Sequence, residues 1–337
     1  MKKIAITIFV CLVLMLFTSC TQAEAGVEHR INIVTTIFPS YDWAKQIIGD
    51  NANNFNLSFL TDSGVDLHSY QPTVSDITRI ISSDIFIYVG GKSDEWITSI
   101  LSNATNANMI TINLMAVLGE AMMLNEHHHD CEHHHHHDCD HHHHDCEHHH
   151  HHDCDYHHLI HEDEHIWLSL NFAKILSTAI AEAIIQLDPS NAELYYINLE
   201  TYIKKLSDLN ARYQDMVESA TTTTLLFADR FPFFHLLNDF GLTHYAAFPG
   251  CSAETEASFS TIAFLIGRIN DLGLTNILVT ESSDHALART ISRDSVMNPQ
   301  IRVLDSMQSV TSRDVQDGVT YLSIMENNLT ILRATLN

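Results

Sequence analysis

The segment that most constrains this chain runs from Glu126 to His158 and consists almost wholly of histidine, aspartate, glutamate and cysteine. It contains four histidine runs, each followed by Asp-Cys and a further acidic residue. Apart from Tyr156 and four cysteines it has no side chain that could enter a hydrophobic core. We therefore expect a flexible insertion that interrupts the fold.

The composition of this segment predicts metal capture, because imidazole, thiolate and carboxylate are the side-chain ligands of zinc and its neighbours. Zn(II) is favoured, and Ni(II), Cu and Co(II) also suit imidazole. A purification tag or a solvated linker is the plainer interpretation, but a tag is normally terminal and pure histidine. The cysteines could form disulfides in three connectivities or act as thiolate ligands. They are Cys131, Cys139, Cys146 and Cys154.

The N-terminus reads as a targeting segment covering residues 1–20. Lys2 and Lys3 precede an apolar run, Ile4 to Phe17, that is too short to span a membrane comfortably. The run ends in Leu-Phe-Thr-Ser-Cys20, which resembles a bacterial lipobox. We expect lipidation of Cys20 and a lipid anchor on the cell membrane, with a plainly cleaved signal as the alternative. Either outcome places the mature protein outside the cytoplasm.

The remaining chain predicts an α/β fold with two parallel-sheet domains. Apolar, β-branched runs alternate with segments of helical periodicity, the pattern of βαβ units. A long amphipathic helix, 189–219, separates the two α/β segments and is expected to link them rigidly. The domains are predicted at 30–188, with 126–158 inserted, and at 220–337. A formal net charge of −25 argues against nucleic acid as a partner.

Three acidic residues follow apolar runs in the second α/β segment. Asp229 ends Thr223–Ala228, Glu281 ends Asn276–Thr280 and Asp305 ends Ile301–Leu304. Because ligands bind beyond the carboxyl ends of strands in open α/β sheets, these acids suggest a pocket. Acids are also common turn residues at such positions.

One catalytic pattern is present, since His161 to His165 reads H-E-x-x-H. A zinc protease would need these residues on a helix, with both histidines on one face and Glu162 as the general base. Three consecutive acids are unusual in such a helix, and a chance match is easy in a chain with 26 histidines.

Several ordered motifs resemble the metal-binding lipoproteins of ABC importers, the ZnuA/TroA-like zinc and manganese carriers. The opening Ile33-Val-Thr-Thr-Ile-Phe-Pro-Ser-Tyr-Asp-Trp-Ala44 is similar, as are Gly64-Val-Asp-Leu-His68-Ser-Tyr-Gln-Pro72 and Asp163-Glu-His165-Ile-Trp-Leu168. The family also places an acidic, histidine-rich loop between the second and third of these. The resemblance covers essentially the whole mature chain.

The resemblance implies four metal ligands, of which His68, His165 and Asp305 match directly. The family's third ligand falls on Arg230, which cannot bind a cation. We expect Asp229 to take its place, with His235 and Glu281 as alternatives, and Arg230 to pair with one of the carboxylates. A two-histidine, carboxylate-rich site suits Zn(II) and would also admit Mn(II).

The implied function is extracytoplasmic capture of zinc, with manganese as the alternative metal, by a monomer that delivers it to an ABC permease driven by a separate ATPase. The metal would lie between the two domains, and the linking helix would allow only modest closure. Affinity would fall as pH drops through about 6.5. Two other functions stay open. A metal buffer would use the histidine-rich segment alone, and a zinc protease would use His161, Glu162 and His165.

Overall fold

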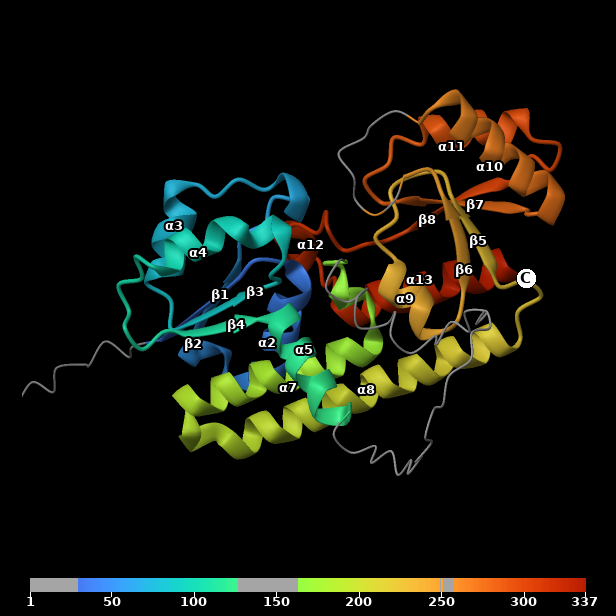
Figure 1. Ribbon diagram of the computed structural model, residues 1–337. Helices are drawn as coiled ribbons and strands as arrows, with labels where there is room; N and C mark the ends of the chain where they lie inside the picture. Colours follow the sequence, from blue (N-terminus) through green and yellow to red (C-terminus); the bar gives the residue numbers. More distant parts are fainter. Residues whose placement is uncertain (1–29, 127–162, 249, 251–256) are drawn as a thin grey trace, which may run out of the picture. The chain divides into compact units, whose positions relative to one another are not determined.

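The computed structural model describes residues 30–126, 163–248, 250 and 257–337, and all statements below concern these residues. From Ile31 to Asn337 the chain forms one compact unit containing two four-stranded sheets. We call the parts built around the first and second sheets the first and second lobe (Figure 1).

The sheet of the first lobe is entirely parallel, with strand order β2-β1-β3-β4. Its strands are β1 (Ile31–Thr35), β2 (Phe55–Phe59), β3 (Ile85–Tyr88) and β4 (Ile110–Asn113). The helices between and after them are α2 (Phe38–Ile48), α3 (Val74–Ile81), α4 (Glu95–Leu101) and α5 (Leu114–Glu126). A capping box begins α3, because Thr73 and Asp76 bond each other's backbone N–H.

The second lobe repeats this plan with order β6-β5-β7-β8, again all parallel. Its strands are β5 (Thr224–Phe227), β6 (Thr243–Ala246), β7 (Asn276–Thr280) and β8 (Gln300–Leu304). Its helices are α9 (Phe234–Asp239), α10 (Phe259–Leu272), α11 (Ala286–Asp294), α12 (Ser312–Gln316) and α13 (Tyr321–Leu336). The predicted fold class of two parallel α/β lobes and a long helix is therefore confirmed.

The alternation of side chains along each strand builds a layer on both faces of each sheet. Val34 and Phe86 pack against α3 and α4, whereas Ile33 and Ile85 point to the opposite face, toward α2 and α7 (Leu170–Leu187). In the second lobe, α10 and α11 cover one face and α13 lies on the other (Figure 1).

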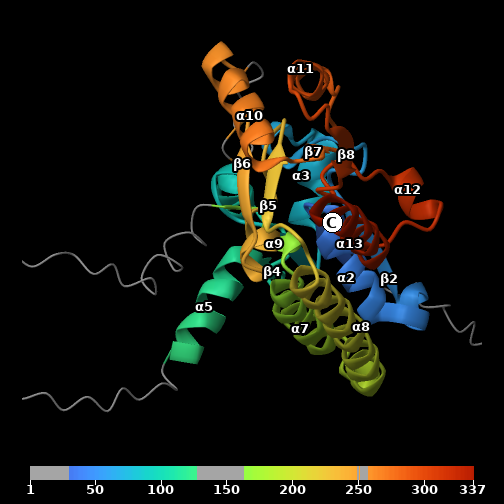
Figure 2. The same ribbon diagram turned by 90° about the vertical axis from the view of Figure 1, so that its right-hand side faces the viewer.

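The long helix α8 (Ala192–Glu218) joins the cores of both lobes. The apolar positions that make this helix amphipathic are buried, among them Tyr195, Leu199, Tyr202, Leu206 and Leu209. Helices α7 and α8 run side by side, and α13 contacts α8 from the second lobe (Figure 2). One continuous hydrophobic cluster includes strands from both sheets as well as these helices. The two lobes thus share a core on the α8 side.

Side-chain caps mark where two helices begin. A 3-10 turn, Ile166–Leu168, precedes α7, and Ser169 caps α7 by accepting from the N–H of Phe172. Helix α13 begins at Tyr321, directly after its cap Thr320. Helix α7 is also the one described helix long and apolar enough to cross a membrane, and half of it is buried against its neighbours.

Candidate metal centre

His68 lies on a short 3-10 turn, Leu67–Ser69, that follows β2 in the first lobe. Asp66 caps this turn, and its Oδ1 accepts from the backbone N–H of His68 at 2.8 Å. The Nδ1 of His68 lies 2.7 Å from Ser93 Oγ, in the turn after β3. The loops after β2 and β3 therefore hold the backbone and one ring nitrogen of His68.

His165 is almost fully buried, with 3% of its surface exposed. Asp163 Oδ1 accepts from its backbone N–H at 2.9 Å and from its Nδ1 at 2.8 Å. The ring packs on the edge of Trp167, whose Nε1 donates to the backbone oxygen of Ser306 at 2.9 Å. The segment carrying His165 is thereby bonded to the loop after β8 in the second lobe.

The two histidines face each other through their remaining ring nitrogens, with 3.0 Å between the Nε2 atoms. Both Nδ1 atoms are engaged, so the two Nε2 atoms share one space, where they form a hydrogen bond in which either ring can be the donor. Lone pairs at this distance repel unless a cation lies between them, either a proton or a metal. Two imidazole nitrogens on one tetrahedral zinc lie roughly 3.3 Å apart, so this pair needs little adjustment to bind zinc.

The three acids expected beyond the second sheet do follow neighbouring strands. The order β5-β7-β8 places Asp229, Glu281 and Asp305 along one edge. Asp229 Oδ2 accepts from the N–H and hydroxyl of Thr280, at 3.0 and 2.7 Å. Glu281 accepts from the N–H and hydroxyl of Ser306, at 2.8 and 2.9 Å. These two carboxylates tie adjacent strand ends together.

Asp305 is held differently, through its backbone. The side chain of the fully buried Asn328 bonds the backbone N–H and the carbonyl oxygen of Asp305, at 2.9 and 2.8 Å. The Asp305 side chain accepts from Met307 N–H and lines a cavity of about 290 Å³. Burial, together with the nearby charge of Glu281, raises the pKa of Asp305 to about 7. A cation beside it would relieve this cost, so Asp305 is the acid best prepared to bind one.

Arg230 pairs with a carboxylate that the sequence did not indicate. Its Nη1 lies 3.7 Å from Oδ2 of Asp66, the residue that caps the His68 turn. Its contact with Asp229 is through the backbone N–H only, at 2.8 Å. The expectation that Arg230 pairs with a proposed ligand was therefore wrong, because its side chain reaches the first lobe instead.

His235, one alternative for the third ligand, lies on α9 with 2% of its surface exposed. Its Nε2 lies 3.0 Å from the backbone oxygen of Asp163, and its ring packs against Phe172 and Phe234. Burial lowers its pKa, which favours the neutral ring. His235 thus supports the segment that orients His165.

The structure brings His68 and His165 together but does not assemble the whole proposed set. Among the described residues, no three histidine, cysteine, aspartate or glutamate side chains form a group that could hold a metal ion. Cys20, His161, Glu162 and nearly all of segment 126–158 lie outside the described residues.

The described part of the H-E-x-x-H pattern does not have the geometry of a zinc protease. Residues Asp163 to His165 are not helical, and a 3-10 turn follows them. Glu164 turns away to the loop after β3, where it accepts from Ser93 N–H at 3.0 Å. The protease alternative is therefore not favoured.

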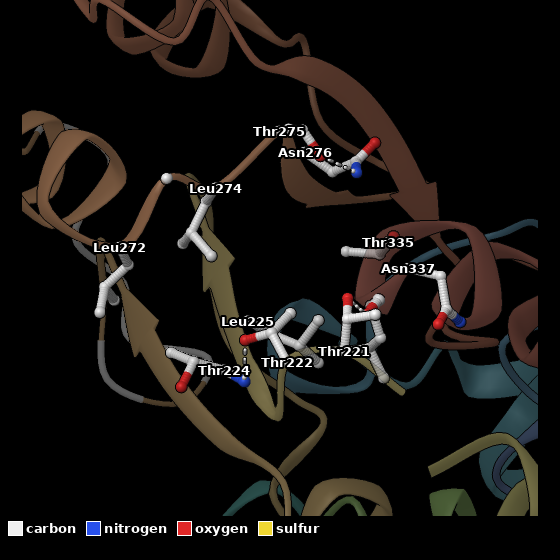
Figure 3. Close-up of a pocket in the computed structure, with 12 residues that line it drawn as sticks. Thr221, Thr222, Thr224, Leu225, Leu272, Leu274, Thr275, Asn276, Thr335 and Asn337 are labelled. Atoms are coloured by element: carbon white, nitrogen blue, oxygen red, sulfur yellow. Dashed lines mark hydrogen bonds between the residues drawn. The ribbon is translucent and has the colours of Figure 1, made fainter. Parts of the chain in front are cut away.

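A second cavity, of about 250 Å³, lies at the opposite edge of the second sheet, next to the N-terminal ends of β5 and β7 (Figure 3). Hydroxyl, amide and aliphatic side chains line it, among them Thr221, Thr335 and Asn276. No acid, cysteine or histidine is present among its described lining residues. It does not resemble a metal site.

The residues that orient the two histidines were not predicted from the sequence: Asp66, Ser93, Asp163 and Glu164. The glycine pair after β3, Gly90-Gly91, is the one local signal that could have pointed to the Ser93 turn, because it marks a loop at the carboxyl end of a buried strand.

Comparison with known proteins gives consistent relatives. The chain is 28% identical to the zinc-binding lipoprotein AdcA of Streptococcus pneumoniae over 99% of its own length and 61% of that protein. It thus spans less than two thirds of the streptococcal relatives it matches. It is 26% identical to the high-affinity zinc uptake system protein ZnuA of Bacillus subtilis, covering 94% of the chain and 92% of that protein.

Solved structures agree with these relatives. The Zn(II)-bound ZnuA-like domain of Streptococcus pneumoniae AdcA superposes with a TM-score of 0.68 at 25% identity, covering 91% of this chain and 99% of that domain. The model of the family described as "Zinc-uptake complex component A periplasmic" matches residues 33–335. This match covers nearly the whole described fold, and the chain belongs to that family.

Proposed function

We propose that this protein captures zinc outside the cytoplasm and delivers it to an ABC permease in the membrane. It acts as a binding protein and not as an enzyme. Manganese remains a second possible cargo, since carboxylates complete the proposed site. The observation that carries the proposal is the pair of Nε2 atoms, His68 and His165, that face each other at 3.0 Å with both Nδ1 atoms already hydrogen-bonded. Membership of a zinc-uptake family supports the same conclusion.

The proposed ligands are His68 and His165 from one side of the site and Asp305 from the other, with Asp229 as the fourth. Asp305 directly precedes Ser306, whose backbone oxygen accepts a hydrogen bond from Trp167 Nε1. Trp167 in turn lies two residues after His165. Metal binding would have to bring the Asp305 carboxylate to the histidine pair, because the cavity that Asp305 lines in this structure is lined by neither histidine. Asp229 needs a larger change, because both its oxygens already accept hydrogen bonds.

The lipid anchor at Cys20, the ATPase partner and the monomeric state belong to the same proposal. An anchor would keep the carrier near its permease, and the family's periplasmic description supports a place outside the cytoplasm. Segment 126–158 would collect metal in weak, exchangeable sites and raise its concentration near the lobes.

Zinc uptake in cells that lack their own zinc-binding protein tests the proposal. The wild-type chain should restore zinc accumulation at limiting metal, and His68→Ala should not. His285→Asn is a suitable control, because His285 has φ 61°, a conformation that asparagine tolerates. Equal uptake by His68→Ala and the control would refute the proposed site. Loss of uptake on deletion of 126–158 alone, at limiting zinc, would show that the segment has a collecting role.

A further inference from the structure

Glu164 is a buried acid beside the proposed site whose role the ligand set does not explain. It lies between Asp163 and His165, with 8% of its surface exposed. Its Oε1 accepts from Ser93 N–H at 3.0 Å, although the two residues are 71 positions apart in the sequence. Its Oε2 lies 3.7 Å from Nδ1 of His68.

The loop after β3 is shaped to receive this carboxylate. Gly91 has φ +79°, and a Cβ at this position would lie 2.6 Å from Glu164 Oε1 and 2.8 Å from its Cγ. Any larger residue would therefore be strained and would also displace the acid. The neighbouring Asp94 steadies the loop by accepting from Gly90 N–H at 2.9 Å.

Ser93 connects Glu164 to His68. Its backbone N–H donates to Glu164, and its hydroxyl lies 2.7 Å from Nδ1 of His68. A negative charge on the Nδ1 side of an imidazole favours a proton on Nδ1 and leaves the Nε2 lone pair available. In His68 that lone pair faces His165.

We propose that Glu164 is a positioning residue that prepares His68 for metal capture. It fixes the Ser93 turn and favours the His68 form in which Nε2 is the ligand atom. The segment Asp163-Glu164-His165 would then carry one ligand and the acids that orient both histidines: Asp163 acts on His165 and Glu164 acts on His68. This inference rests on the proposed function.

Three variants test the inference by zinc competition with a chromogenic chelator. Glu164→Gln can keep the bond from Ser93 N–H but loses the charge, and Ser93→Ala keeps the backbone but loses the hydroxyl. Loss of such an orienting partner typically weakens metal binding by about 10–100-fold. We expect a loss of zinc affinity in this range for Glu164→Gln and for Ser93→Ala. Glu95→Gln removes an exposed charge from the same region and should change affinity less than about twofold. Far-UV circular dichroism checks that each variant is folded.

A second readout does not depend on zinc binding. Ring ¹⁵N spectra of metal-free protein, at a pH where free imidazole is neutral, report which nitrogen of His68 carries the proton. We expect a larger share of Nδ1-protonated His68 in the wild type than in Glu164→Gln, because the charge of Glu164 competes with the Nε2 contact to His165, which favours a proton on Nε2.

The outcomes separate this inference from the proposed function. If Glu164→Gln leaves both affinity and His68 spectrum unchanged, or if Glu95→Gln weakens zinc equally, Glu164 has no positioning role. If the wild type has no His68-dependent zinc site, the proposed function fails, and the spectra alone then decide whether Glu164 orients His68.

Discussion

The Nε2 atoms of His68 and His165 lie 3.0 Å apart, although 97 positions separate the two residues in the sequence. Each ring is held at its other nitrogen, His68 by Ser93 and His165 by Asp163. Holding Nδ1 in this way selects Nε2 as the ligand atom and removes most of the rotational freedom that metal binding would otherwise cost. The pair is therefore organised before a metal arrives.

Replacing Arg230 should strengthen zinc binding. The motif resemblance implies the family's third ligand at Arg230, and a guanidinium repels a cation and cannot bind it. Arg230→His offers a third imidazole and should tighten zinc binding by tenfold or more in a competitive titration. Arg230→Ala is the matched control, since it removes the charge without adding a ligand, and should give a smaller gain. Weaker binding in Arg230→His than in Arg230→Ala would show that this position does not face the metal.

The hydrogen bond between Trp167 Nε1 and the Ser306 carbonyl should matter for both stability and affinity. Trp167→Phe leaves that carbonyl without this donor and removes part of a buried ring, which together should cost about 2–5 kcal/mol in urea unfolding. It also removes one of the bonds that join the His165 segment to the second lobe, beside those from His235 and Tyr321, so zinc affinity should fall as well. Unchanged affinity in a folded Trp167→Phe protein would argue that the two lobes do not meet at the metal.

Both lobes should unfold together, because a single hydrophobic cluster runs through both sheets and α8. Leu206→Ala, at a fully buried position of α8, should lower the free energy of unfolding by about 2–5 kcal/mol. Ile197→Ala on the same helix is the control, because Ile197 is 54% exposed and should cost far less. Two separate unfolding transitions, with only one shifted by Leu206→Ala, would contradict a shared core.

Stability should fall between about pH 4 and pH 6 because of Asp239. Burial raises the pKa of this carboxyl from 3.8 to about 6, even though Ser169 donates to it at 2.7 Å. The folded state then binds the proton more tightly than the unfolded state. The stabilisation is therefore present below pH 4 and is lost as pH rises through 6. In Asp239→Asn, the free energy of unfolding should fall by roughly 2–3 kcal/mol less over this pH range than in the wild type.

The measurement for Asp239 is urea unfolding across this pH range. Asp208→Asn is a suitable control, because Asp208 is largely exposed and its ion pair with Lys204 contributes little. An equal decline in Asp239→Asn and the wild type would assign the pH dependence to other groups.

Much of the fold could be predicted from the sequence because its strands and long helices carry strong patterns. The β-branched run at Ile31 and the apolar stripe of α8 identify their elements directly. Strand β6 was missed, because this edge strand is short and half exposed and so lacks a buried apolar run.

The two histidines of the site could be predicted from local motifs, but their supports could not. Ser93 and Glu164 are ordinary polar residues in their own segments, and only the folded chain brings them into contact. The partner of Arg230 was missed for the same reason, since Asp66 lies in the other lobe. Side chains that act across long sequence separations leave no periodic pattern.

A competitive titration with Zn(II) and Mn(II), comparing the mature protein with a form that lacks 126–158, shows whether the lobes themselves hold the metal. The shortened protein should keep one tight zinc site, which His68→Ala or His165→Ala should abolish and His285→Asn should not. Loss of all tight binding together with segment 126–158 would contradict this prediction. The protein would then be a metal buffer, and the facing histidines would be only a hydrogen-bonded pair.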